Sequence, residues 1–310
     1  MPGADGERAA IERIRIALPQ APDDETWIGD DAAVVPGPGA GSLLLAADTV
    51  VEGVHFDLDL VEASDVGWKV LAVNVSDIAA MGGTPLHALV TIVGASNSVI
   101  DGLVSGLAEA CSTYDCAVVG GDLSSGPLLV VTVAITGTTG GGRAVLRTGA
   151  HAGDQIFVTG PLGRSSAGLR ALRAHPGDVG PADLDLVAAY RRPQARVAEG
   201  LAASGSGATA MIDISDGLGI DLDRLATASG IGIVLDDAPA ACGATYEDAL
   251  AGGEDYELIF TAADSSAVSR VFAEAGLRPP IRIGECVADR TARLIGGQPL
   301  AASGWEHRLR

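Results

Sequence analysis

The sequence predicts a two-domain protein of the α/β or α+β class. Apolar segments typical of strands alternate with longer segments of helical periodicity in both halves of the chain. The 310 residues are enough for two domains of ordinary size, and a hydrophobic content of 47% allows a large buried core. The glycine-rich segment 137–154 separates the halves, so we expect one domain at residues 1–147 and a second at 148–310.

In the first half, we expect a short amphipathic helix at 7–18 and further helices at 63–82 and 100–112. The helix at 63–82 has Ser64 or Asp65 as its N-terminal cap and ends at Gly82, since these residue types favour those positions. Runs of apolar, largely β-branched residues predict buried strands at 42–48, 87–93, 116–122 and 128–137.

In the second half, the segment 184–205 is expected to form two helices interrupted at Pro193, because proline cannot continue a helix. Further helices are predicted at 165–175, 217–230 and 265–276. Strands are predicted at 155–160, 208–215, 231–235 and 257–262.

The charge of the chain limits its function. Acidic residues outnumber basic ones by 40 to 20, which argues against a nucleic-acid-binding face and means that a polyanionic ligand would be repelled unless cations intervene. The single lysine, Lys69, does not follow a glycine, so a Walker-type phosphate loop is excluded.

No apolar run approaches the ~18 residues that a membrane span needs, and the N-terminus lacks the apolar core of a signal peptide. We therefore expect a cytoplasmic protein that binds neither membrane nor nucleic acid.

Carboxylates occur at unusual places, most densely in "MIDISDGLGIDLDRL" (211–225), where four aspartates interrupt an apolar segment. A buried carboxylate is costly unless its charge is compensated. Apolar strands run into Asp48, Asp122 and Asp213, and Asp77 lies on the same helix face as Asn74. Other carboxylates lie in glycine-flanked turns: Asp30, Asp31, Asp216, Glu254 and Asp255. Any one of them could be a cap or turn residue, but together these oxygen ligands favour Mg²⁺, which would hold a polyphosphate.

Seven motifs occur in an order that resembles the thiamine-monophosphate kinase family, over about residues 28–305. They are "IGDDAAV", "AADTVVEGVHF", "GWKVLAVNVSDIAAMGG", "VVGGDLSSG", "RTGAHAGDQIFVTG", "IDISDGLGIDL" and "GGEDYELIFT". The resemblance implies the two-domain fold of the aminoimidazole-ribonucleotide synthetase-like superfamily. Its N-terminal α+β domain pairs into a dimeric β-barrel, which makes a homodimer, and its C-terminal domain is α/β.

The resemblance also implies a reaction: ATP and thiamine monophosphate give ADP and thiamine diphosphate, the final step of thiamine diphosphate biosynthesis. Several Mg²⁺ ions bind with ATP in a cleft between the domains. Because the acceptor is itself a phosphate, whose second pKa is ~6, it is already a nucleophile, and direct in-line transfer needs no catalytic base.

Site residues are implied by the same resemblance. The catalytic carboxylates are Asp48, Asp122 and Asp213. The metal ligands are Asp30, Asp31, Asp48, Asp77, Asp122, Asp213 and Asp216. The nucleotide contacts are Tyr114, Gly121, Asp122, Arg147 and Ser215, and the substrate contacts are His55, Glu254 and Trp305. The chain departs from the family at Ala46 and Ala47, where hydroxyl residues are common, so only a backbone carbonyl could bind metal there.

Two alternatives remain open from the sequence. A selenophosphate synthetase would need a reactive Cys or selenocysteine in an N-terminal glycine-rich loop, and no Cys precedes residue 111. A non-enzymatic acidic cation-binding protein would carry its acidic residues in runs on solvated faces, whereas here they follow apolar strands.

Overall fold

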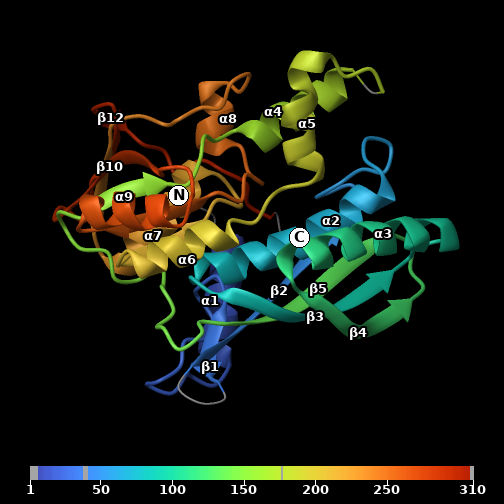
Figure 1. The fold of residues 1–310 in the computed structure, drawn as a ribbon, viewed down its shortest axis with the longest axis horizontal. Helices are drawn as coiled ribbons and strands as arrows, with labels where there is room; N and C mark the ends of the chain where they lie inside the picture. Colours follow the sequence, from blue (N-terminus) through green and yellow to red (C-terminus); the bar gives the residue numbers. More distant parts are fainter. Residues whose placement is uncertain (1–5, 38–40, 176, 308–310) are drawn as a thin grey trace.

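The computed structural model describes residues 6–37, 41–175 and 177–307, and these residues form two β-sheets with helices packed against them (Figure 1). The strands of the first sheet lie between residues 33 and 138, and those of the second lie between residues 155 and 299. This confirms the predicted alternation of strands and helices in both halves.

The first sheet has the strand order β1-β2-β5-β3-β4. The strands are β1 (Ala33–Pro36), β2 (Ser42–Val51), β3 (Thr84–Val93), β4 (Ala117–Ser124) and β5 (Val130–Thr138). One face carries α2 (Ala63–Ala80), and α3 (Asn97–Tyr114) packs on α2 (Figure 1). The two helices approach closely at Gly106, where a Cβ atom would lie 1.8 Å from the carbonyl oxygen of Ser64. The helix α2 is thereby buried between the sheet, α3 and the second half of the chain.

The helix α2 begins at Ala63, as predicted, but its cap residue differs from the prediction. Its cap is Glu62, rather than Ser64 or Asp65, and the Asp65 carboxylate accepts the Glu62 backbone N–H at 3.4 Å. Asp65 thus completes a capping box from inside the first turn, a position where an acidic residue also favours the helix dipole. The helix ends at Ala80, and Gly82 follows in the left-handed conformation, as expected of a stop residue.

The prediction that residues 116–122 form a buried strand is wrong in one respect. The strand β4 exists, but every residue in it is exposed, because β4 is an edge strand that pairs only with β3. Leu89 of β3 and Leu45 of β2 are also exposed on the face of the sheet opposite to α2. The sheet is therefore open, and the predicted barrel is not closed within one chain.

The second sheet has the order β12-β11-β8-β10-β6-β9-β7, with mostly antiparallel pairing. Its strands are β6 (Gln155–Val158), β7 (Ala210–Asp213), β8 (Gly232–Leu235), β9 (Leu258–Ala262), β10 (Ile281–Val287), β11 (Arg293–Ile295) and β12 (Gln298–Pro299). The helical elements of this half are α4 (Arg164–Ala174), η1 (Pro181–Asp183), α5 (Leu184–Arg191), α6 (Val197–Gly205), α7 (Leu218–Ser229), α8 (Tyr246–Ala251) and α9 (Ser265–Glu274).

Most predicted elements are present, with small shifts at their ends. The helices α5 and α6 flank Pro193 as expected, and the carbonyl oxygen of Pro193 accepts a hydrogen bond from the Trp68 indole at 2.8 Å. The break at this proline thus serves to dock the second half on α2. The sequence patterns do not predict β1, β10, β11, β12 and α8, because these elements are short or lack a clear period.

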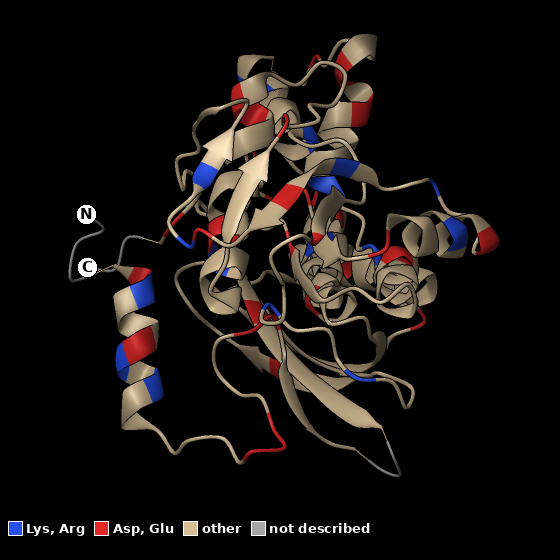
Figure 2. Ribbon diagram, turned by 90° about the vertical axis from the view of Figure 1, so that its left-hand side faces the viewer, with Lys and Arg blue, Asp and Glu red and all other residues tan. Residues whose placement is uncertain are grey.

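The first helix, α1 (Glu7–Ala17), stands away from the body of the molecule (Figure 2). It has no buried residue, and its contacts include an ion pair between Arg8 and Asp223 at 3.5 Å. Among the described residues, no helix is both long and apolar enough to cross a membrane.

Candidate active site

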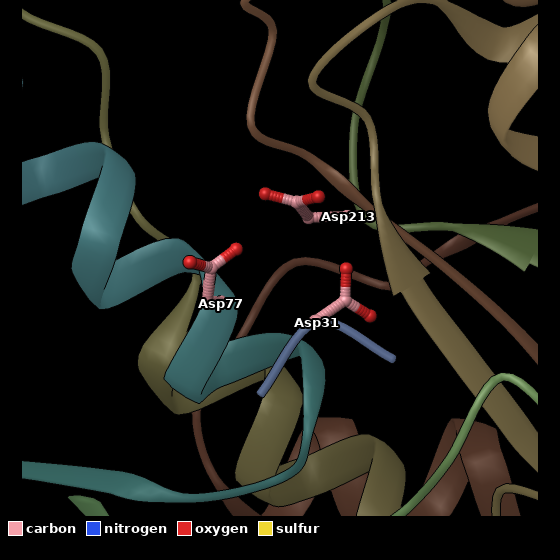
Figure 3. A group of neighbouring side chains, drawn as sticks. All are labelled: Asp31, Asp77 and Asp213. Carbon is pink, nitrogen blue, oxygen red and sulfur yellow. The ribbon is translucent and has the colours of Figure 1, made fainter. Parts of the chain in front are cut away.

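Three carboxylates meet where the two halves of the chain join (Figure 3). Asp31 comes from the turn before β1, Asp77 from α2, and Asp213 is the last residue of β7. One oxygen atom of each lies within 4.8 Å of the others. The cluster thus joins two segments of the first half to one of the second, and its donor set of oxygen atoms suits a hard cation such as Mg²⁺.

The protein compensates the charges of Asp77 and Asp213 poorly. Burial, followed by the neighbouring carboxylates, raises the pKa values of Asp77 and Asp213 well above their usual range. The Ser76 hydroxyl donates a hydrogen bond to Asp213 at 2.6 Å. Ser76 is not among the predicted site residues, although its position next to Asp77 in the "NVSDIAAMG" motif is a signal that could have identified it.

Arg147 brings a positive charge to one side of this group. Its guanidinium donates hydrogen bonds to both carboxylate oxygens of Asp31, at 2.5 and 3.3 Å, and its backbone N–H donates to Asp30 at 3.0 Å. Although burial alone would lower the pKa of Arg147, its contacts with Asp31 hold that pKa above the usual value. Burial, together with the charge of Asp31, raises the pKa of Asp30 to about 7. Arg147 therefore orders the 30–31 turn but leaves Asp77 and Asp213 largely uncompensated.

Asp48 lies near this group but inside β2, rather than at a strand end as expected. Its backbone N–H donates to the side-chain oxygen of Asn74 on α2 at 2.9 Å, which fixes β2 to that helix. Loss of surrounding water, followed by the charges of Asp216 and Asp31, raises the pKa of Asp48. Ala46 and Ala47 precede it in the same strand and are paired with β5.

The other aspartates of segment 211–225 have protein partners. Asp221, which is 1% exposed, receives hydrogen bonds from the backbone N–H groups of Asp216 and Gly217, and pairs with Arg224 at 2.7 Å. Arg224 also pairs with Asp216 at 2.5 Å. Asp223 pairs with Arg293 at 2.8 Å. Of the four aspartates in this segment, Asp213 is the one that lies in the cluster, whereas the other three pair with arginines. Burial and the charge of Asp216 still raise the pKa of Asp221 to about 7.

The three predicted substrate contacts lie near one another. His55 accepts a hydrogen bond from the Val51 backbone N–H through Nδ1 at 3.0 Å, so the neutral ring carries its proton on Nε2. Burial lowers the pKa of His55, while the charge of Glu254 opposes that shift. Trp305 is 52% exposed, and its backbone N–H donates to the Asp216 carbonyl at 2.9 Å. His307, which has no role predicted from the sequence, has its ring 5.3 Å from that of His55 and 6.0 Å from that of Trp305.

Not all predicted site residues come together within one chain. Asp122 is exposed on β4, where the Ser124 hydroxyl donates to it at 2.9 Å. Across the sheet, Asp122 is in register with Thr91, Thr132 and Thr49, so it lies on the face opposite to α2. Three inter-strand spacings, or about 14 Å, separate β4 from β2. Asp122 is therefore distant from Asp48, and Gly121 lies beside it on the same edge strand.

Tyr114 and Ser215 take part in backbone contacts. The Tyr114 hydroxyl accepts the Ala195 backbone N–H at 3.0 Å, and its ring packs against Trp68. The Ser215 carbonyl accepts the Glu254 backbone N–H at 2.7 Å. A Cβ atom at Gly253 would lie 2.6 Å from that carbonyl oxygen, so this approach requires the glycine of the "GGED" motif.

Comparisons with known proteins agree with this architecture. The family model described as AIR synthase related protein, N-terminal domain, matches residues 29–139, and the corresponding C-terminal domain model matches residues 151–297. The fold that carries the carboxylate cluster is thus that of an AIR synthase related protein.

More specific relatives share most of the chain. Thiamine-monophosphate kinase of Escherichia coli (strain K12) is 36% identical over 307 residues, which cover 92% of this chain and 92% of that protein. The Bacillus subtilis (strain 168) protein of the same name is 38% identical over 251 residues, covering 76% and 77%. The solved structure "AaThiL complexed with AMPPCP and TMP" superposes with a TM-score of 0.86 at 34% identity, covering 98% of this chain and 97% of that one. This chain belongs to the thiamine-monophosphate kinase family.

Proposed function

We propose that this protein transfers the terminal phosphoryl group of ATP directly to the phosphate of thiamine monophosphate, giving thiamine diphosphate and ADP. The observation that carries the proposal is the cluster of Asp31, Asp77 and Asp213, located between the two halves of a chain whose relatives bear the name of this activity. A solved relative was complexed with AMPPCP and TMP, which supports the same pair of ligands here.

The cluster fits Mg²⁺ on three grounds. Its donors are all carboxylate oxygens, they lie within 4.8 Å of one another, and burial raises the pKa values of Asp77 and Asp213, so a cation would relieve a real electrostatic cost. Two further aspartates could extend the ligand set. The charge of Asp48 raises the pKa of Asp77, and Asp30 lies next to Asp31 in the same turn. When bound, Mg²⁺ would supply the positive charge that offsets repulsion among the ATP polyphosphate, the acceptor's phosphate monoester and an acidic protein.

The protein's own task in this reaction is positioning. The acceptor phosphate is largely dianionic at pH 7 because its second pKa is ~6, so no side chain has to remove a proton from it. By holding Mg²⁺, the carboxylates would fix where the phosphates lie, and Arg147, which bonds to Asp31, would contact phosphate oxygens beside that residue. Transfer in line between two held phosphates gains its rate from orientation and charge neutralisation.

The rest of the acceptor would extend away from the cluster along α2. Lys69, beside Glu254, precedes Asp77 by eight residues on that helix, which corresponds to about 12 Å along its axis. Burial lowers the pKa of His55, which favours the neutral ring, and a neutral ring does not repel the cationic thiazolium. The half-exposed Trp305 can offer its indole face to the same ring. The ring of His307, 6.0 Å from that of Trp305, lies beside the same proposed binding position.

A coupled assay of ADP release tests the activity. We expect Mg²⁺-dependent ATP consumption with thiamine phosphate and little with unphosphorylated thiamine, because thiamine lacks the phosphate that the cluster would hold. Equal turnover of the two acceptors, or none with thiamine phosphate, contradicts the proposal.

We propose further that the protein acts as a homodimer in which the exposed face of the first sheet meets a second copy. That face includes Leu45, Leu89 and the β4 edge, and a second copy would cover them. Asp122 is far from the cluster of its own chain and would then contribute to the active site of the second copy. Gly121, beside it on the same strand, would contribute to that site as well.

Mixing two inactive variants tests this arrangement. In a mixed dimer of Asp122→Asn and Asp213→Asn subunits, one site would contain only wild-type aspartates if Asp122 acts across the interface. Random reassociation should then restore about a quarter of the wild-type activity. If Asp122 acts in its own chain, no activity returns, and light scattering that shows a monomer rejects the dimer itself.

A further inference from the structure

The only lysine of the chain is buried beside a predicted substrate contact. Lys69, on α2, is 2% exposed, and its Nζ lies 3.1 and 3.0 Å from the two carboxylate oxygens of Glu254. The same Nζ lies 4.0 Å from the centre of the Tyr190 ring on α5. A buried ammonium is costly unless it is paired, and here one carboxylate and one aromatic face provide the compensation.

Glu254 is held in an unusual backbone conformation. Its φ is 63°, in the left-handed region that non-glycine residues rarely occupy, and Tyr256 has a φ of 50°. The backbone of the segment is anchored where Glu254 N–H bonds to Ser215 and Tyr256 N–H bonds to Ile214. Such strain persists only where surrounding contacts impose it, and it occurs often at functional sites.

We propose that Lys69 is a positioning residue, which holds the Glu254 carboxylate in the orientation that receives the acceptor's ring system. This inference rests on the proposed function, in which Glu254 contacts thiamine phosphate. Each carboxylate oxygen has two lone pairs, so contact with Lys69 leaves acceptor capacity on the outward side of Glu254. The Glu254 side chain remains 24% exposed, whereas that of Lys69 is 3% exposed, so the ligand reaches the glutamate and not the lysine.

The ion pair also sets the character of the contact. With Lys69 in place, the ion pair has no net charge. Glu254 then recognises hydrogen-bond donors of thiamine phosphate through the geometry of the hydrogen bonds more than through charge attraction. Without Lys69, the Glu254 carboxylate can turn toward solvent, and its oxygens no longer face the substrate in a fixed orientation. Lysine suits this place because its ammonium is a compact point charge, which fits between a carboxylate and an aromatic ring.

The experiment is a double-mutant cycle of Lys69→Met, Glu254→Gln and the double variant, in full-length protein with ATP and thiamine phosphate. Lys69→Met should raise the KM for thiamine phosphate about 10-fold, equivalent to about 1.4 kcal/mol, and leave the KM for ATP unchanged. The double variant should be no worse than Glu254→Gln, because Lys69 acts only through Glu254. Lys69→Arg, which keeps the charge, should restore part of the loss.

The control is Arg270→Met, which removes a positive charge from the exposed Arg270–Glu274 pair on α9 and should change neither KM. The double variant leaves no buried charge unpaired, so it keeps the cycle interpretable if a single variant folds poorly. An unchanged or lowered KM for thiamine phosphate in folded Lys69→Met overturns the inference, as do additive effects of the two single changes. Wild-type turnover of thiamine phosphate reports separately on the proposed function, so the two failures are distinguishable.

Discussion

Asp213 and Asp221 lie eight residues apart and are both buried, at 3% and 1% exposure, yet the protein treats their charges differently. Asp221 has Arg224 and two backbone N–H groups as partners. Asp213 has the Ser76 hydroxyl as a partner and faces the carboxylates of Asp31 and Asp77. The first arrangement stabilises a helix start, whereas the second leaves negative charge that a bound cation can compensate. Both aspartates have a like-charged neighbour, since Asp216 acts on Asp221, so the difference is the arginine that pairs directly with Asp221.

The strongest test of this comparison removes one charge from the carboxylate cluster and one from the arginine-paired aspartates. Asp213→Asn should lower kcat at least ~100-fold, since loss of an electrostatic stabiliser costs roughly 3–4 kcal/mol in the transition state. The folded protein should be as stable as wild type or more so, because a repelled buried charge has gone. Asp223→Asn, the same change at an arginine-paired aspartate, is the matched control and should keep nearly full activity. A full-speed Asp213→Asn enzyme would refute the assignment.

The stabilisation that bound ligand gives should also differ between the clustered aspartates and the arginine-paired aspartates. Mg²⁺ with a non-hydrolysable ATP analogue should raise the melting temperature, with a gain of about 2.7 kcal/mol at a ligand concentration of about 100 times Kd. The gain should be much smaller in Asp213→Asn and unchanged in Asp223→Asn, as measured by thermal denaturation with and without EDTA. Equal gains in both variants would show that Asp213 does not take part in binding.

The Asp221 side of the comparison predicts the opposite pattern. Asp221→Asn should lower the free energy of unfolding by about 1–3 kcal/mol, although burial and the charge of Asp216 raise the pKa of Asp221 to about 7. One carboxylate oxygen accepts both backbone N–H groups and the other accepts Arg224, and the amide nitrogen of asparagine cannot accept a hydrogen bond at either place. The kcat of the folded fraction should stay close to wild type. Denaturant unfolding and an assay at low temperature measure the two quantities. A large loss of kcat with normal stability would place Asp221 in the site instead.

A smaller effect concerns pH. Burial raises the pKa of Asp255 from 3.8 to about 7, although backbone N–H groups of Gly163 and Ser165 bond to it. The folded state therefore holds this proton more tightly than the unfolded state, so the carboxyl's contribution to stability is full below pH 3.8 and is lost as pH rises toward about 7. Its slope is below ~1.4 kcal/mol per pH unit.

The measurement for this last prediction is the free energy of unfolding between about pH 4 and 8 for wild type and Asp255→Asn. The variant should show a flatter decline over that range, and the two curves should run parallel above about pH 7. Identical slopes throughout would mean that Asp255 titrates normally.

Local patterns predicted the order of elements well where they are strong. The stop residue of α2, the break at Pro193 and the strand that ends at Asp213 all follow from short-range preferences of the chain. The family followed from seven ordered motifs and is confirmed by relatives that are 36% and 38% identical. The short β1 and the exposure of β4 did not follow, because periodicity alone does not reveal which strand becomes an edge. The cap of α2 was misplaced because Asp65 favours both the cap and the first turn.

Residue types alone also determined that carboxylates rather than His or Cys would form the site. Only the tertiary structure decided which of them meet. It brings Asp31, Asp77 and Asp213 together and gives Asp216, Asp221 and Asp223 arginine partners. It also pairs Lys69 with Glu254 across 185 positions of the chain. The physical reason is that a buried charge is compensated by whatever lies within a few ångströms of it, and sequence spacing does not record those neighbours once the chain folds back on itself.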